Sequence, residues 1–154
     1  MIGIVDYGLG NVLAFANIYK RLGIPVTLAR SADELNQATH LVLPGVGAFD
    51  WAMERLEASG MRPVLDRLVM EERRPVLGIC VGMQMMATRS DEGSANGLGW
   101  FDAEVKRFDE ARIQSRTHLP HMGWNDVRPS AGEPIFDGIQ DDGARFYFLH
   151  SYYF

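Results

Sequence analysis

A single cysteine is the strongest chemical signal in this sequence. Cys80 lies in the segment L-G-I-C-V-G-M-Q at 77–84, where an apolar run leads into a G-x-C-x-G pattern. This is the arrangement of a nucleophile elbow with cysteine in place of serine, set on a sharp turn between a strand and a helix. Because side chains at Gly78 or Gly82 would crowd such a turn, the two glycines favour it. The alternative is a buried structural cysteine at a tight turn, since cysteine is often a small buried hydrophobe.

Two backbone N–H groups are candidates to stabilise an oxyanion next to this thiol. The first belongs to Val81, at the start of a helix whose N-terminus should favour the thiolate. The second lies in L-P-G-V-G-A-F at 43–49, which also follows a predicted parallel strand and should emerge at the same sheet edge. There Gly47 could turn its N–H inward. A plain strand-to-helix connection would use glycines too, so this loop alone does not decide the function.

The elements that must position these groups alternate along the chain. Apolar runs predict strands at residues 2–5, 25–29, 40–43 and 75–79. Helical spacing predicts helices at 12–22, between an Asn11 N-cap and Gly23, at 49–56, at 64–69 and from 84 to 88. Ser31 and Glu34 form a capping box that opens another short helix. This alternation predicts an α/β fold, with a mostly parallel sheet that has helices on both faces.

The C-terminal half follows a different pattern. Alternating residues at 101–107 and the aromatic run at 145–154 predict shorter strands, and the polar residues 108–120 predict a loop. We see no interdomain linker, so we predict a single domain at 1–154.

Composition excludes several classes of function. The net charge of −5 gives no electrostatic support for binding nucleic acid. No apolar run approaches the ~20 residues of a membrane span, and the N-terminus lacks the features of a signal peptide. With one cysteine in 154 residues, no internal disulfide can form, which favours a reducing, cytoplasmic location.

The remaining motifs predict no cofactor. D-Y-G-L-G-N at 6–11 suggests a dinucleotide loop, but Leu13 stands at its third glycine position and Arg30 follows the second predicted strand. The four histidines lack close ligand spacing, so we predict no metal site. His121 and His150 lie in aromatic segments, where structural histidines with satisfied hydrogen bonds are the more common reading.

These motifs resemble a known family. G-I-C-V-G-M-Q at 78–84 and P-G-V-G-A-F at 44–49 resemble the nucleophile motif and the oxyanion loop of class I glutamine amidotransferases. Three other stretches resemble the glutaminase subunits of imidazole glycerol phosphate synthases: 6–11, P-H-M-G-W-N at 120–125, and F-Y-F-L-H-S-Y-Y at 146–153. The likeness spans nearly the whole chain in order. It implies the flavodoxin-like amidotransferase fold, with extra antiparallel strands in the C-terminal half.

The resemblance also implies roles for individual residues. Cys80 would attack the side-chain amide of glutamine and form a glutamyl thioester, with the oxyanion held by Gly47 and Val81. Ammonia would pass to a (β/α)₈ cyclase subunit in a heterodimer, which makes imidazole glycerol phosphate and aminoimidazole carboxamide ribotide in histidine biosynthesis. The residues matching glutamine-binding positions are Gln84, Ser151 and Tyr152. Those matching positions near the cyclase are Asn11, His121, Trp124, Asn125 and Tyr147.

The sequence departs from the family in one respect. The family carries a catalytic histidine and glutamate in an H-P-E segment beyond the H-S-Y-Y motif, and no H-P-E occurs in these 154 residues. Thiol chemistry still needs a base, and the departing ammonia needs an acid. We therefore expect a domain that is incomplete at its C-terminus and inactive alone.

Three other functions remain open at this point. A paralogous glutaminase could supply ammonia to amidate a sugar in bacterial surface-polysaccharide synthesis. A non-catalytic module could bind a barrel partner, although the intact elbow argues against it. A different cysteine enzyme, such as a peptidase, could share the fold, although Gln84 together with the P-G-V-G loop favours glutamine as the substrate.

Overall fold

The chain forms two compact units, which are described separately. A computed structural model describes residues 1–113, 118–128, 134–138 and 144–154. The first unit comprises Met1–Lys106 together with Phe154, and the second comprises Arg107–Tyr153.

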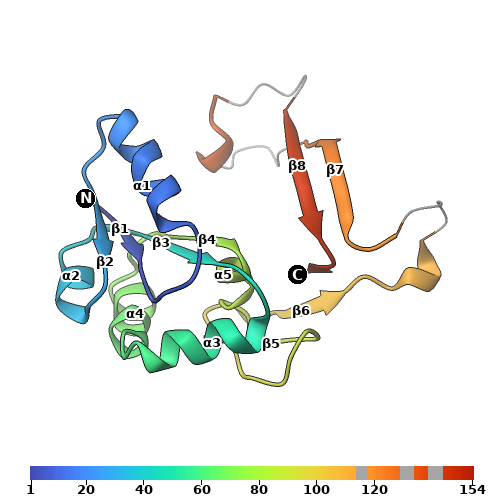
Figure 1. The fold of residues 1–154 in the computed structure, drawn as a ribbon, viewed down its shortest axis with the longest axis horizontal. Coiled ribbons are helices and arrows are strands. Elements are labelled where there is room, and N and C mark those ends of the chain that lie inside the picture. Colours follow the sequence, from blue (N-terminus) through green and yellow to red (C-terminus); the bar gives the residue numbers. More distant parts are fainter. Residues whose placement is uncertain (114–117, 129–133, 139–143) are drawn as a thin grey trace. The chain divides into compact units, whose positions relative to one another are not determined.

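The first unit is built on a parallel sheet of four strands in the order β2-β1-β3-β4 (Figure 1). The strands are β1 (Ile2–Val5), β2 (Val26–Ala29), β3 (His40–Gly45) and β4 (Val76–Cys80). In register, Ile2 pairs with both Val26 and His40, and Gly45 at the end of β3 pairs with Cys80 at the end of β4. The carboxyl ends of the two strands that carry the predicted chemistry therefore lie side by side.

Helices cover both faces of this sheet, as the alternating pattern predicts. Helix α1 (Val12–Arg21) packs with Ile4 and Val42 on one face (Figure 1). The other face carries the larger core, to which the next three helices contribute. Their bounds are Ala32–Asn36 for α2, Phe49–Ala58 for α3 and Arg62–Asp66 for α4, with a π turn at Arg67–Glu71.

The predicted helix caps are present, with one change. The Asn11 side chain accepts a hydrogen bond from the Ala14 N–H, at 3.2 Å, and opens α1. Ser31 accepts from the Glu34 N–H, at 3.3 Å, and opens α2. The Glu34 carboxylate, however, accepts from the N–H of Arg30, one residue before the cap. Only half of the expected capping box is formed.

The prediction of a helix from residue 84 to residue 88 is wrong. Helix α5 spans only Val81–Gln84, directly after β4. The carbonyl groups of the next residues accept hydrogen bonds from a later loop: Leu98 N–H donates to Met85, at 2.7 Å, and Phe101 N–H donates to Met86, at 3.0 Å. Carbonyls that are engaged by a distant loop are not free to continue a helix, so tertiary pairing ends α5 after one turn.

The third predicted strand is longer than expected, because β3 continues through Pro44 and Gly45. Its pairing with β1 stops at Val42, whereas its pairing with β4 continues to Gly45. A proline, which lacks an N–H, is tolerated where one side of the ladder is already unpaired.

The later part of the chain contains short strands, as predicted. Strands β5 (Arg89–Ser90) and β6 (Glu104–Arg107) pair in parallel. In the second unit, β7 (His121–Asp126) and β8 (Arg145–His150) form an antiparallel ladder (Figure 1). The aromatic run is interrupted at Ser151, before β9 (Tyr152–Tyr153). The 3₁₀ turns span Glu110–Arg112 and Pro134–Phe136.

The predicted loop at 108–120 contains the first of these 3₁₀ turns, and its residues 114–117 lie outside the described part of the chain. Among the residues that the structure describes, no helix is long and apolar enough to cross a membrane.

Leu35→Ala should lower the free energy of unfolding by about 2–5 kcal/mol, because Leu35 is fully buried in the main core and its truncation leaves a cavity. Urea denaturation followed by circular dichroism measures the loss. Leu22→Ala is the matched control, since Leu22 is exposed at the end of α1 and should change stability by no more than about 0.5 kcal/mol. Equal losses in the two variants would contradict this assignment of the core.

Candidate active site

The structure places Cys80 on a strained turn, as the elbow pattern predicts. It is the last residue of β4 and the residue before α5, with φ 55° and ψ −122°. A residue with a side chain rarely adopts a positive φ. Such residues are concentrated at functional sites, where the surrounding structure holds them in place. The cysteine is also exposed. The alternative prediction of a buried structural cysteine is therefore wrong.

Three glycines let the segments around this turn approach each other at backbone distance. A β-carbon added to Gly82 would lie 2.0 Å from the Leu43 carbonyl oxygen. One added to Gly45 would lie 2.4 Å from the Gly82 nitrogen, and one added to Gly78 would lie 2.4 Å from the Cα of Met83. These contacts are much shorter than a real side chain allows. The ends of β3 and β4 and the start of α5 therefore pack backbone against backbone.

Helix α5 contributes less to the thiolate than the sequence suggests. It has four residues, so few peptide dipoles align behind Cys80. The N–H of Val81 still belongs to the first turn, where intrahelical acceptors are lacking. Val81 itself is buried beneath the turn. The local donor at this position is thus retained, and the predicted dipole effect is weaker than that of a full helix.

The glycine loop leaves the sheet next to the cysteine, because Gly45 pairs with Cys80 in the β3–β4 register. Gly47 lies two residues beyond, with φ +86° and open space where a side chain would be. Val46 beside it is exposed. The loop therefore has a free tip at the predicted oxyanion donor.

A buried tyrosine holds the first end of this loop. The Tyr7 hydroxyl donates to the Pro44 carbonyl oxygen at 2.7 Å and lies 3.5 Å from the sulfur of Met85, just after α5. Burial raises the pKa of Tyr7 well above its usual value, which keeps the hydroxyl proton available for donation. The tyrosine thus ties the loop to the segment that follows the nucleophile.

Two acidic residues hold the other end of the loop. The Phe49 N–H donates to the Glu92 carboxylate at 3.0 Å. The Asp50 carboxylate accepts from the N–H groups of Ser94 and Ala95, each at 2.9 Å. These backbone N–H groups lower the pKa of Asp50 below its usual range. The start of α3 is therefore fixed to the loop that follows β5.

Sequence reasoning missed Tyr7, Asp50 and Glu92. Each lies tens of residues from its partner in the sequence, so no local spacing predicts these contacts. The acidic residues look like ordinary solvated loop and helix residues until the fold brings the segments together.

Gln84, the predicted substrate-binding residue at the end of α5, carries a buried acceptor. It is only 8% exposed, and its side-chain oxygen has no hydrogen-bond partner among the described residues. An unpaired buried amide oxygen costs about 1–3 kcal/mol. Such an atom is well suited to accept a hydrogen bond from a ligand that carries N–H groups.

The other two substrate-binding candidates lie in the second unit. The carbonyl oxygen of Ser151 accepts a hydrogen bond from the Phe108 N–H at 3.0 Å. The carbonyl oxygen of Tyr152 lies 2.8 Å from Nδ1 of His150. Both residues are half-buried, and their backbone is held by neighbours inside this unit.

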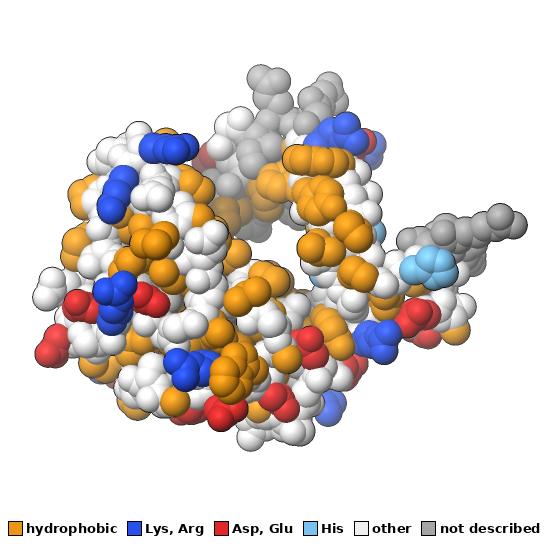
Figure 2. Space-filling view, viewed as in Figure 1, with side chains coloured by type: hydrophobic (Ala, Val, Ile, Leu, Met, Phe, Trp, Pro, Cys, Tyr) orange, Lys and Arg blue, Asp and Glu red, His pale blue; other side chains and the backbone are white. Residues whose placement is uncertain are grey.

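An apolar surface covers one face of the β7–β8 ladder, and two of the predicted interface residues lie on it (Figure 2). Trp124 and Tyr147 are directly opposite each other and are 63% and 51% exposed. Their rings meet edge to face, with centroids 5.6 Å apart. The neighbouring pair Met122 and Leu149 is exposed as well. We refer to these four residues as the hairpin face.

The remaining interface candidates have partners within their own units. Asn11 caps α1 in the first unit. His121 and Asn125 lie half-buried in the second unit and contact each other, with 3.0 Å between Nε2 of His121 and Nδ2 of Asn125. His121 is also hydrogen-bonded to His150, which confirms the prediction of satisfied structural histidines. In the part of the chain that the structure describes, no cluster of three or more potential ligands could hold a metal ion.

Comparison with known proteins decides the family. A family model described as "Glutamine amidotransferase class-I" matches residues 3–154. The chain belongs to this family. Among solved structures, one described as "Crystal structure of glutamine amidotransferase" superposes with a TM-score of 0.61 over 81% of this chain and 62% of that chain. At 21% identity this likeness shows the fold alone, and it confirms the predicted fold class.

Curated relatives of this amidotransferase are more informative. It is 59% identical over 154 residues to the "Imidazole glycerol phosphate synthase subunit HisH" of Bdellovibrio bacteriovorus, covering all of this chain and 75% of the relative. It is 46% identical over 153 residues to subunit HisH 2 of Pseudomonas aeruginosa and 45% identical over 153 residues to subunit HisH of Leptospira interrogans. Each of these two matches covers 99% of this chain and 74% of the relative. These relatives confirm the resemblance to the synthase glutaminases.

Cys80→Gly should be at least as stable as Cys80→Ala, which reverses the usual order. Glycine normally destabilises by about 0.5–1 kcal/mol relative to alanine. At φ 55°, however, removing the β-carbon relieves strain of about 1–3 kcal/mol, and alanine keeps that strain. Urea denaturation of the two variants measures the difference. If the glycine variant unfolds first, the turn at Cys80 is not strained.

Proposed function

We propose that this chain is the glutaminase subunit of an imidazole glycerol phosphate synthase. In this role it hydrolyses glutamine to glutamate and ammonia and supplies the ammonia to a cyclase subunit in histidine biosynthesis. The observation that carries the proposal is the exposed Cys80 at a left-handed turn between strand and helix, in a chain 59% identical to a synthase subunit along its whole length.

The first half of the reaction forms a thioester. The Cys80 thiolate attacks the carbonyl carbon of the glutamine side-chain amide, and the carbonyl oxygen becomes an oxyanion. The N–H groups of Val81 and Gly47 would stabilise this charge, because donors placed in advance stabilise the tetrahedral intermediate more than the substrate. The C–N bond then breaks, and the leaving nitrogen takes a proton to depart as ammonia.

The second half restores the enzyme. A water molecule attacks the glutamyl thioester, the C–S bond breaks, and glutamate leaves while the sulfur returns as a thiol. Both halves need a group that moves protons. The family's H-P-E segment supplies it, and that segment has no counterpart in these 154 residues. We therefore expect efficient turnover only when that segment is supplied.

Three residues are the proposed contacts of the substrate glutamine. The buried Gln84 oxygen would accept a hydrogen bond from an N–H group of the substrate glutamine. Ser151 and Tyr152 would bind the substrate from the second unit, where their backbone is already held in place. The reaction would use no cofactor, since a cysteine, backbone donors and an acid–base side chain can together hydrolyse an amide.

The acceptor of the ammonia would be a cyclase subunit of (β/α)₈ fold in a heterodimer. Asn11 and the hairpin face would each contact this subunit, with Trp124 and Tyr147 as the anchors. Large exposed aromatic side chains are enriched among the residues that carry most of the binding energy at interfaces. The names of the relatives favour histidine biosynthesis over a paralogous role in surface-polysaccharide amidation. A biosynthetic subunit of this kind would work in the cytoplasm.

Glutamate release tests the chemistry directly. This chain is mixed with the cyclase subunit and its ligand, and the same assay is run on a chain extended by the H-P-E segment of a relative. We expect the extended chain to release glutamate at least a hundredfold faster, because a positioned acid–base group contributes about 10²–10⁴ in rate.

Cys80→Ala is the control for both forms and should abolish release, since alanine has no nucleophile. Release that persists in this variant would exclude the thioester mechanism. Release by the 154-residue chain at the full rate would show that another group serves as the base.

Trp124→Ala should weaken binding to the cyclase subunit by about tenfold or more, because truncating an aromatic anchor typically costs upwards of 1 kcal/mol. Titration calorimetry of the two purified subunits measures the affinity. Trp51→Ala is the matched control, since Trp51 is a similarly exposed tryptophan (49%) on α3 and is not among the predicted interface residues. Similar losses in both variants would place the docking site elsewhere.

A further inference from the structure

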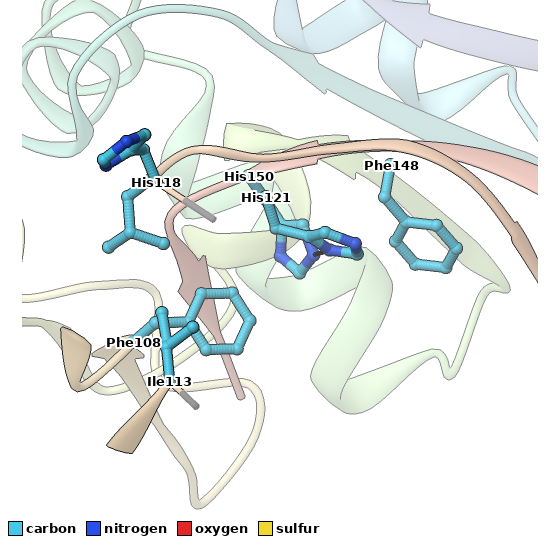
Figure 3. A pocket seen from close by; sticks show the side chains of 7 residues that line it. Phe108, Ile113, His118, His121, Phe148 and His150 are labelled. Atoms are coloured by element: carbon cyan, nitrogen blue, oxygen red, sulfur yellow. Dashed lines mark hydrogen bonds between the residues drawn. The ribbon is translucent and has the colours of Figure 1, made fainter. Parts of the chain in front are cut away.

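A series of hydrogen bonds runs through the second unit from a predicted partner-binding residue to a predicted substrate-binding residue. Nδ2 of Asn125 lies 3.0 Å from Nε2 of His121, and Nδ1 of His121 lies 3.2 Å from Nε2 of His150. Nδ1 of His150 lies 2.8 Å from the carbonyl oxygen of Tyr152. The two rings face each other across the β7–β8 ladder, where His121 and His150 are paired (Figure 3).

For neutral imidazole rings, the chemistry of these groups sets one direction for the protons in the series. A carbonyl oxygen only accepts, so His150 must carry its proton on Nδ1 and donate to Tyr152. Nε2 of the neutral His150 ring then accepts, and His121 must donate to it from Nδ1. Nε2 of His121 accepts in turn, and the donor facing it is the amide NH₂ group of Asn125. The orientation of the Asn125 amide therefore agrees with the proton direction set by the Tyr152 carbonyl at the other end of the series.

The rings in this series are held by aromatic packing. Phe108 meets the His150 ring edge to face, with centroids 5.1 Å apart, and stacks on Tyr153 at 4.7 Å. Phe148 lies against His121, with centroids 5.6 Å apart. Phe108, Phe148 and the two histidines line a cavity of about 430 Å³. Its other lining residues are Ile113, His118 and Leu119 (Figure 3). The histidines therefore have little freedom to turn away from their partners.

We propose that His150, oriented by His121 and Asn125, is a positioning residue that holds the Ser151–Tyr152 backbone in its glutamine-binding conformation. The proposal rests on the function proposed above and adds a positioning residue to its substrate site. Asn125 belongs to the predicted cyclase-facing set, and Tyr152 to the predicted substrate-binding set. The Asn125 amide donates to Nε2 of His121 and so helps to hold that ring against His150.

Two substitutions separate this role from simple packing. In His150→Asn, the side-chain NH₂ group can take the place of Nδ1 and keep the bond to the Tyr152 carbonyl, although the contact with His121 is lost. In His150→Gln, the longer side chain can reach the position of Nε2 and keep the contact with His121, while the bond to Tyr152 is lost. Both replacements are neutral amides, so a general loss of packing would affect them alike.

Glutamine affinity is measured by titration calorimetry on the complex with the cyclase subunit, with Cys80→Ala present in every variant so that glutamine is not consumed. We expect His150→Gln to weaken glutamine binding by about five- to tenfold, the effect of one lost hydrogen bond. His150→Asn should stay within about twofold of the parent. In the chain with native histidines, nitrogen-15 NMR should find the proton on Nδ1 of both His121 and His150.

Equal affinities in the two His150 variants, whether both weakened or both unchanged, would overturn the positioning role. A His150 ring protonated on Nε2 alone would overturn it as well, since that tautomer places no donor on the Tyr152 carbonyl. If the Cys80→Ala parent complex binds no glutamine, the proposed function itself fails and this inference fails with it. That outcome is distinguishable, because it appears before any histidine is changed.

Discussion

The close approach of three backbone segments around Cys80 is the constraint on which the rest of the site depends. A β-carbon on Gly82 would lie 2.0 Å from the carbonyl oxygen of Leu43, so β3 and α5 can meet only where the chain lacks side chains. This contact places the start of α5 against the end of β3 and forces Cys80 into a left-handed turn between them. The thiol at this turn is exposed at the end of β4.

The glycine loop beside the thiol combines firm ends with a free tip. Tyr7 fixes the Pro44 carbonyl at one end, and Glu92 and Asp50 fix the start of α3 at the other. Between them, Gly47 has a positive φ and open space around it. A peptide in such a position can reorient without disturbing the sheet or the core. The arrangement suits an oxyanion donor that has to be placed accurately and still be open to regulation.

In the second unit, apolar and polar side chains lie on opposite faces of the β7–β8 ladder. Met122, Trp124, Tyr147 and Leu149 are exposed on the hairpin face, while His121 and His150 point the other way and satisfy each other. The alternation of side chains along a strand is what separates the two faces. One short antiparallel pair can therefore present an apolar docking surface and also carry a hydrogen-bonded series to the Ser151–Tyr152 segment.

The sequence by itself determined the parallel α/β architecture, the caps at Asn11 and Ser31, and the nucleophile elbow. These features depend on local composition and periodicity, which act within a few residues. Family resemblance added the candidate roles of residues that no spacing rule identifies, such as Gln84 and Tyr152. Only the tertiary structure decided the length of α5, because the carbonyls of Met85 and Met86 are taken by N–H groups from the loop at 97–101. It also decided the anchoring contacts of Tyr7, Asp50 and Glu92 and the contact between His121 and His150. Each of these depends on atoms that are distant in sequence and meet only after the chain has folded.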